Sequence, residues 1–202
     1  MVRLNSTGTY TEPLEQPITP EEMYTVLPKV GRNKSPGSDG IGIEFYTTNW
    51  EIIKEDISEI LDQMFLQRII TTQQKQGVRV CLLKSNAALT PEGYQPLTLL
   101  NTDYKILARI LAHRLRPVLE EHLRTSQFCS VHGNSVIEAL STVRDAVAQA
   151  GITVTPLCVL TLDVYEAFDG LSHQYLFTIL ESYVTCPCFN ERIKDLYENA
   201  TA

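Results

Sequence analysis

One apolar run constrains the fold of this chain more than any other feature. Residues 157–163 read Leu-Cys-Val-Leu-Thr-Leu-Asp, so an almost continuous apolar segment ends at an acidic side chain. A short continuous apolar run is typical of a strand that is buried on both faces of a sheet. We therefore predict a buried central strand over Leu157–Leu162, with Asp163 at its end. If Asp163 binds a metal ion, it should face a cleft and be bonded to no protein cation.

The aspartate at the end of this strand needs compensation for its charge, because a buried carboxylate without a partner is costly. A hard cation such as Mg²⁺ is one compensation, since it prefers carboxylate oxygens. The alternative is that an arginine, a lysine or a helix N-terminus near Asp163 compensates the charge. The residues of this segment leave the metal ion and the protein group equally open.

Helical spacing of apolar residues predicts helices on either side of the strand. They begin near Thr19, Ile52, Asp103, Val136, Ser172 and Asn190. Thr19 is a favourable N-cap because Pro20 follows it and Glu22 completes a capping box. Pro28 and Pro117 lie inside two of the helices, so we expect an early end at the first and a kink or break at the second.

Two shorter segments predict a β-hairpin. Gly77–Lys84 is rich in apolar residues and alternates, Leu97–Leu100 forms a second short strand, and a loop lies between them. Residues 1–18 are polar and contain two prolines, so they are expected to form an extended or frayed lead. The order of helices and strands predicts an α+β or α/β fold.

The composition excludes several classes of protein. The chain has 202 residues, 44% of them hydrophobic, and a net charge of −7, which favours a folded globular domain over a disordered chain. No apolar run approaches the roughly 18 residues of a membrane span, and the N-terminus has no apolar signal segment. Five scattered cysteines argue against a disulfide framework. We expect an intracellular protein, cytoplasmic or nuclear, with no membrane partner.

The charges are distributed unevenly along the chain. Residues 68–116 carry eight basic and two acidic groups, a net charge of +6, between flanking segments of −6 and −7. A basic block inside an acidic protein is expected where a surface faces phosphate groups. The alternative is that these side chains form only the solvated face of a helix.

Six segments of the chain form an ordered series of motifs. They are Lys34–Gly40 (Lys-Ser-Pro-Gly-Ser-Asp-Gly), Leu82–Lys84, Tyr94–Ala108, Ala112–Leu119, Gln127 with Val131–Gly133, and Asp163–Asp169 followed by Leu171–His173. Their order and spacing resemble the reverse transcriptases of non-LTR (LINE-type) retrotransposons. The resemblance extends from residue 19 to about residue 199.

This resemblance implies the fold and function of a piece of a polymerase. The expected fold is α+β, with helix-rich fingers and the first half of the palm of a right-hand polymerase, truncated. Residues 1–18 would be a polar lead, 19–156 a fingers-like region containing the basic block 68–116, and 157–202 a partial palm with the first catalytic motif. The implied activity is RNA-directed DNA synthesis, with Mg²⁺ as cofactor and RNA template, DNA primer and deoxynucleoside triphosphates as partners.

The resemblance also assigns roles to single residues. Asp163 would be catalytic and a metal ligand, with the backbone carbonyl of Val164 beside it. Phe168 would lie under the incoming sugar and exclude a 2′-hydroxyl, or else be a core aromatic, and Lys84 would meet the triphosphate. The side chains expected to contact nucleic acid are Lys34, Arg79, Arg109 and Arg116. We expect Lys84 and the three arginines to share one concave face with Asp163 on its rim.

The chain departs from the family pattern at positions that matter for chemistry. Gln95 and Asn134 stand where the family has arginine, and Glu166 stands where it has lysine. No pair of adjacent carboxylates follows residue 169, so the family's remaining metal ligands are absent from these residues. We therefore expect this chain alone to be inactive as a polymerase. The alternative functions are a non-catalytic nucleic-acid-binding remnant and, with less support because Tyr165 replaces an expected aspartate, a metal-dependent phosphatase.

Overall fold

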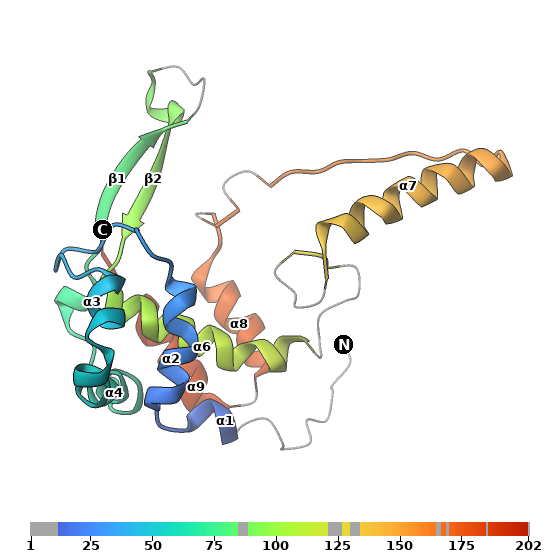
Figure 1. Cartoon of the computed structure of the whole chain (residues 1–202). Coiled ribbons are helices and arrows are strands. Elements are labelled where there is room, and N and C mark those ends of the chain that lie inside the picture. Colours follow the sequence, from blue (N-terminus) through green and yellow to red (C-terminus); the bar gives the residue numbers. More distant parts are fainter. Residues whose placement is uncertain are drawn as a thin grey trace. The chain divides into compact units, whose positions relative to one another are not determined.

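The structure is a computed structural model that describes residues 12–84, 89–120, 127–129, 134–164, 167–168, 170–184 and 186–201. These residues form helices and one two-stranded antiparallel sheet, which confirms the α+β class (Figure 1). The chain divides into two compact units. The first comprises residues up to Leu115 together with those from Val184 onward, and the second comprises Arg116–Tyr183.

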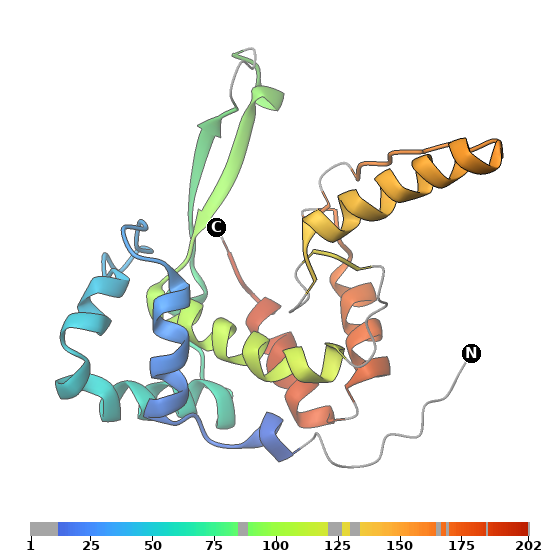
Figure 2. The same cartoon turned by 45° about the vertical axis from the view of Figure 1, so that its right-hand side comes forward.

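Helices make up most of the first unit. They are α1 (Glu12–Glu15), α2 (Pro20–Val30), α3 (Ile43–Thr48), α4 (Trp50–Leu66), α5 (Thr72–Lys75), most of α6 (Thr102–Glu120), and α9 (Pro187–Tyr197). Each of the longer helices buries an apolar stripe, for example Met23 of α2, Phe65 of α4, Ile110 of α6 and Phe189 of α9. In both ribbon views α2 crosses α6 (Figure 2). Their shared core therefore joins segments that are far apart in the sequence.

The ends of these helices follow the capping rules only in part. The Thr19 side chain accepts a hydrogen bond from the Glu22 backbone N–H at 3.3 Å, as predicted, whereas the Glu22 carboxylate, expected to complete a capping box, accepts from Arg114 instead. The early end at Pro28 is wrong, because α2 continues to Val30 and stops before Gly31, whose φ is 91°. Of the kink or break predicted at Pro117, the break is excluded, since α6 continues to Glu120. The residues four positions before the two prolines are exposed, so water can reach the carbonyl that each proline leaves unpaired.

The predicted lead and the last helix also differ from expectation. Leu14 and Ile18 are 1% and 2% exposed, so residues 12–18 are packed against the core and do not form a frayed tail. The backbone of Ile18 donates to Asp62 at 2.6 Å and accepts from the Ser58 hydroxyl at 2.7 Å. Helix α9 begins at Pro187 and not at Asn190, because proline suits the first position of a helix.

The predicted hairpin is confirmed. Strand β1 (Val78–Leu83) pairs antiparallel with β2 (Tyr94–Leu99), with Val78 opposite Leu99 and Leu83 opposite Tyr94. The 3-10 turn η1 (Pro91–Gly93) leads into β2. Nearly all residues of both strands are exposed, and the hairpin extends away from the helices of its unit (Figure 1). At its root, Thr201 forms a parallel bridge with Gln76 and accepts from the Gly77 N–H at 2.7 Å.

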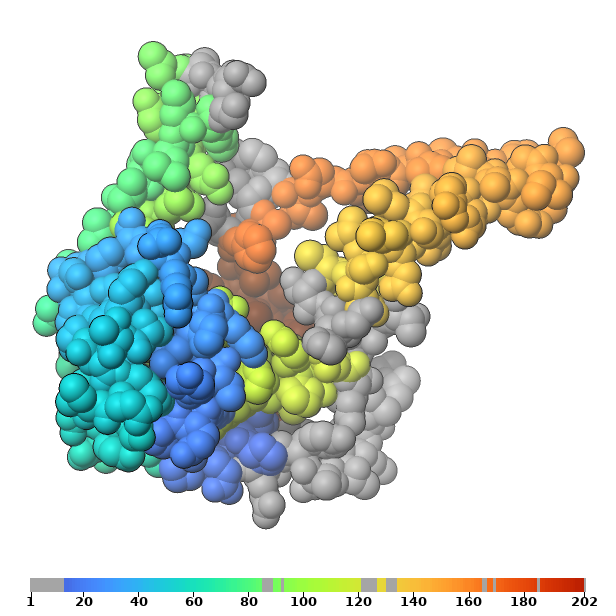
Figure 3. Space-filling view, viewed as in Figure 1, coloured from blue at the N-terminus to red at the C-terminus, as the bar shows by residue number. Residues whose placement is uncertain are grey.

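The second unit contains the main disagreement with the sequence. Helix α7 (Val136–Thr153) runs past Gly151 and buries none of its residues, and α8 (His173–Tyr183) begins after Ser172 as predicted. Between them, residues 156–164 form an extended segment that is not a strand, and both views show it running back along α7 (Figure 2). Figure 3 shows its side chains at the surface on the face in view.

The predicted buried strand over Leu157–Leu162 is therefore wrong. Leu160 and Leu162 are 75% and 80% exposed. A strand is stabilised by backbone hydrogen bonds to a neighbouring strand, and no described segment pairs with this one. The apolar composition of the run is that of a buried strand, but its surroundings here do not bury it.

No helix within the described ranges is long and apolar enough to span a membrane.

Candidate nucleic-acid and nucleotide site

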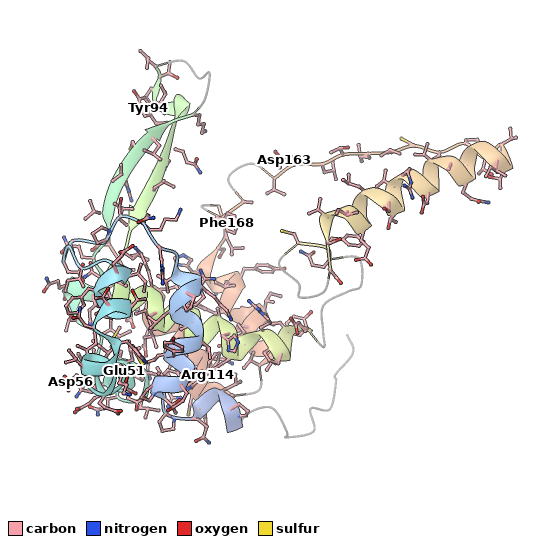
Figure 4. All side chains as sticks on the ribbon, viewed as in Figure 1. Glu51, Asp56, Tyr94, Arg114, Asp163 and Phe168 are labelled. Atoms are coloured by element: carbon pink, nitrogen blue, oxygen red, sulfur yellow. The ribbon has the colours of Figure 1, made fainter. Side chains whose placement is uncertain are left out.

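The aspartate singled out by sequence lies near the end of the extended segment 156–164. Asp163 is exposed, and one of its carboxylate oxygens accepts from the Val164 backbone N–H at 3.0 Å. No ion pair joins it to a lysine or arginine in the part of the chain that the structure describes. Phe168 lies between this segment and α8 in the sequence and is 95% exposed, so it is not a core aromatic here (Figure 4).

These residues supply only part of a magnesium site. Among the described residues no cluster of three or more histidine, cysteine, aspartate or glutamate side chains could hold a metal ion. Asp163 offers one carboxylate and Val164 one carbonyl, whereas Mg²⁺ requires near-octahedral oxygen coordination. Glu166 and Asp169 lie outside the described residues. The described side chains therefore do not fit a bound Mg²⁺ by themselves.

Half of the basic block is used inside the first unit. Arg68 forms an ion pair with Asp195, and the Lys75 ammonium donates to the Glu198 carbonyl at 2.8 Å. Lys105 donates to a carbonyl of the loop 34–40, and burial lowers the pKa of its ammonium group. These three side chains hold the fold together and do not form a free basic surface.

The fourth of these basic residues is almost completely buried. The Arg114 guanidinium pairs with the Glu22 carboxylate through two hydrogen bonds of 2.6 and 2.7 Å, and its side chain is only 6% exposed. It also donates to the carbonyls of Gln16 and Pro17, at 2.6 and 3.0 Å. Arg114 therefore joins α6 to α2 and to the segment before it.

The other half of the block coincides with the side chains expected to contact substrate. Arg79, Lys84, Arg109 and Arg116 are all exposed, as is Lys34 in the preceding loop. Among the described residues, no ion pair involves the three arginines. Side chains alternate along a strand, so Arg79 on β1 and Lys84 just after it leave the hairpin on opposite faces. One shared face for these two cations is therefore not what the structure shows.

The loop 34–40 is held by a residue that the sequence reasoning did not single out. Asn101, immediately before α6, is 2% exposed, and its Oδ1 accepts from the Ser38 hydroxyl and from the Asp39 N–H, both at 3.4 Å. Within the loop, the Asp39 carboxylate accepts from the Ile41 N–H at 3.0 Å. Asn101 and the loop belong to two of the six motifs in the ordered series, but nothing in the motifs indicates that the two are bonded to each other.

Comparison with known proteins decides the family. The family model described as "Reverse transcriptase (RNA-dependent DNA polymerase)" matches residues 57–201. The chain belongs to the reverse transcriptase family. The matched range includes Arg79, Lys84, Asp163 and Phe168.

Three curated relatives of this reverse transcriptase chain are transposon proteins. The "Transposon TX1 uncharacterized 149 kDa protein" of Xenopus laevis is 34% identical over 94% of the chain, which spans 14% of that relative. The "Probable RNA-directed DNA polymerase from transposon BS" of Drosophila melanogaster is 24% identical over 90% of the chain and 22% of its own length. The "Retrovirus-related Pol polyprotein from type-1 retrotransposable element R2" of Popillia japonica is 26% identical over 82% of the chain and 22% of its own length.

These relatives place the chain among the reverse transcriptase domains of non-LTR retrotransposons, as its motifs indicated. The chain spans less than a quarter of the length of each relative. The family match begins at residue 57, whereas the similarity to the Xenopus protein extends over almost the whole chain, so the latter carries the resemblance into the N-terminal segments.

Proposed function

We propose that this chain provides the fingers and the first part of the palm of a right-hand polymerase that copies RNA into DNA. The supporting observation is the family match over residues 57–201, which covers most of the ordered motifs. In this proposal residues 1–18 are a lead, 19–156 the fingers and 157–202 the beginning of the palm. The lead is more ordered than its composition suggests, because its described part packs on α4 through Ile18.

The proposed roles follow the exposed side chains. Asp163 is the catalytic carboxylate and one ligand of Mg²⁺, whose other ligands come from outside the described residues. Lys84 contacts the triphosphate, and Phe168 lies under the sugar beside the Val164 carbonyl. The cations proposed to contact template or primer phosphates are Lys34, Arg79, Arg109 and Arg116. Their exposure supports this, since phosphate contacts require accessible lysine and arginine side chains and no particular base sequence.

The exposed extended segment also has a place in this proposal. We infer that residues 157–163 pair into the palm sheet when the later motifs of a reverse transcriptase pack against them. Their β-branched and apolar side chains suit a strand that is covered on both faces. Pairing would bury the apolar side chains that the present structure exposes, and would leave Asp163 at the end of a strand.

The proposal is tested by primer extension on an RNA template with Mg²⁺ and deoxynucleotides. Residues 1–202 alone should not extend the primer, because one carboxylate at the proposed site does not complete a two-metal centre. A chimera in which these residues replace the matching segment of the Popillia R2 relative should extend it. Asp163→Asn should reduce extension by the chimera at least about a thousandfold, as expected for loss of a metal ligand at the reacting phosphate.

The matched control is Asp145→Asn, which removes an exposed carboxylate of α7 that pairs with its neighbour Arg144. It should leave extension unchanged. An active chimera that tolerates Asp163→Asn would contradict the catalytic role. Salt-dependent RNA binding by the chain, weakened by Arg79→Ala, together with an inactive chimera would instead favour the non-catalytic nucleic-acid-binding alternative.

A further inference from the structure

A single buried amide side chain joins three segments of the first unit. Through its Oδ1, Asn101 accepts from Ser38 and Asp39 of the loop 34–40. Through its Nδ2, it donates to the Gln73 backbone carbonyl in α5 at 3.1 Å. Because Asn101 is 2% exposed, water cannot readily take the place of these bonds at its amide group.

The loop approaches Asn101 too closely for any residue but glycine at position 37. A Cβ atom on Gly37 would lie 2.1 Å from the Asn101 Oδ1 and 2.5 Å from the Asn101 backbone nitrogen. Since one of these atoms is backbone, rotation of the Asn101 side chain could not relieve the contact. Flanking bonds hold the loop on both sides, from the Thr102 hydroxyl to the Ile41 carbonyl at 2.6 Å and from the Lys105 ammonium to the Ser35 carbonyl at 3.4 Å.

The same residue lies at the root of the hairpin. Strand β2 ends at Leu99, two residues before Asn101, and α5, which accepts its Nδ2 bond, leads into β1. The hairpin is exposed on both faces, so few packing contacts along its length fix its direction. Six residues of strand extend about 20 Å, and a 10° tilt at the root would therefore move the tip by roughly 3 Å.

We propose that Asn101 is a positioning residue that fixes the loop 34–40 in register with the hairpin β1–β2. It thereby holds Lys34, on the loop, at a set distance from Arg79 and Lys84, on and just after β1. We call the bonds from Asn101 to the loop 34–40 and to Gln73 the Asn101 clamp. The substrate contacts of these cations rest on the proposed function, but the clamp itself rests only on the geometry of the first unit.

The first test measures hydrogen exchange in the 202-residue chain, which needs no enzymatic activity. Asn101→Ala should speed exchange of the Asp39 and Gly40 amides about tenfold or more, and should also loosen residues 72–76, while α2 and α4 stay protected. Asn101→Asp keeps the acceptor for the loop but loses the donor to Gln73. It should therefore leave the loop protected and loosen only residues 72–76.

The matched control is Asn49→Ala, which removes a hydrogen bond that stays within one helical turn, from Asn49 to the Phe45 carbonyl. It should not alter exchange at residues 35–41. Equal loosening of all helices by Asn101→Ala would show a general loss of stability and overturn the proposal. So would an unchanged loop, or identical exchange patterns in the two Asn101 variants.

The second test asks whether the clamp matters to substrate. In the active chimera, Asn101→Ala should raise the KM for deoxynucleotides several-fold more than it lowers kcat, because misplaced cations weaken binding of the phosphates. Asn101→Asp should recover part of this loss. Loosening of the loop with kinetics identical to those of the unmodified chimera would overturn the positioning role. An inactive chimera would count against the proposed function, and the exchange measurements would still decide whether the clamp exists.

Discussion

At the scale of single residues, the basic side chains divide by what surrounds them. Arg114 lies among a carboxylate and several backbone carbonyls, and its guanidinium stands 5.2 Å from the centre of the Phe65 ring. Arg192 lies 4.3 Å from the same ring centre. Arg109, five residues before Arg114 on α6, is exposed. Of these two arginines on α6, Arg114 therefore forms part of the core, whereas Arg109 lies at the surface.

Arg114→Met should lower the free energy of unfolding by about 3 kcal/mol, because it leaves the largely buried Glu22 carboxylate and two carbonyls without their donor. Urea unfolding of the chain measures this effect. Arg109→Met is the control on the same helix and should change stability by less than about 0.5 kcal/mol. Similar losses in the two variants would show that the Glu22 pair contributes little to the fold.

At the scale of elements, α6 and α7 have comparable apolar periodicity in the sequence but different surroundings in the structure. Leu111 of α6 is 1% exposed, whereas Leu140 of α7 is 66% exposed. Leu111→Ala should cost about 3 kcal/mol through lost contacts and a cavity. Leu140→Ala should cost less than about 1 kcal/mol, since its side chain is already in water. Thermal or urea unfolding checks both, and a large loss at Leu140 would mean that α7 is packed in solution.

Structural features that are set by neighbouring residues could be predicted from the sequence. The start of α2 and the pairing of β1 with β2 are decided by neighbouring residues, namely the Thr19 cap and strand alternation, and both were predicted. The burial of residues 157–163 depends on a partner strand, and no local pattern can supply one. The apolar composition therefore indicated a segment suited to a buried strand, but it could not show whether a partner strand covers that segment in this chain.

In the candidate site, too, some residues could be predicted from the sequence and others could not. Asp163 and the exposed cations were found because motif and charge mark them. Asn101 was not singled out, because an asparagine between a strand and a helix is common in turns. Its importance lies in its hydrogen bonds to Gln73, which is 28 positions away in the sequence, and to Ser38 and Asp39, which are more than 60 positions away. Contacts of that range become visible only once the chain is folded.

At the scale of the whole molecule, stability should depend on pH through a tyrosine that joins α6 to α9. Tyr104 is 7% exposed and donates from its hydroxyl to the Leu196 carbonyl, and burial raises its pKa from 10.0 to about 12. In the unfolded chain this phenol ionises near pH 10, so its contribution is fully present below that pH. The contribution is lost as the pH rises from about 10 to about 12.

We expect the free energy of unfolding to fall by about 1 kcal/mol between pH 9 and pH 11 from this residue alone. Tyr104→Phe should make that part of the pH profile less steep, although it lowers stability at neutral pH by removing a hydrogen bond. The slope that remains includes the contribution of Tyr46, whose pKa burial also raises. The exposed Tyr175 of α8 provides the control, since Tyr175→Phe should leave the slope as it is. An unchanged slope in Tyr104→Phe would assign the alkaline loss to other groups.

The bridge between Gln76 and Thr201 has a consequence for the order of folding. The second unit, residues 116–183, is inserted between the two parts of the first. Translation proceeds from the N-terminus, so the ribosome releases the whole insertion before α9 and Thr201 become available. Until then the contacts that α9 and Thr201 make with the first unit are missing, among them the hydrogen bond from the Gly77 N–H to the Thr201 carbonyl. The nascent first unit therefore keeps apolar surface uncovered until residues 184–201 are synthesised, and this is the interval in which chaperones would engage it.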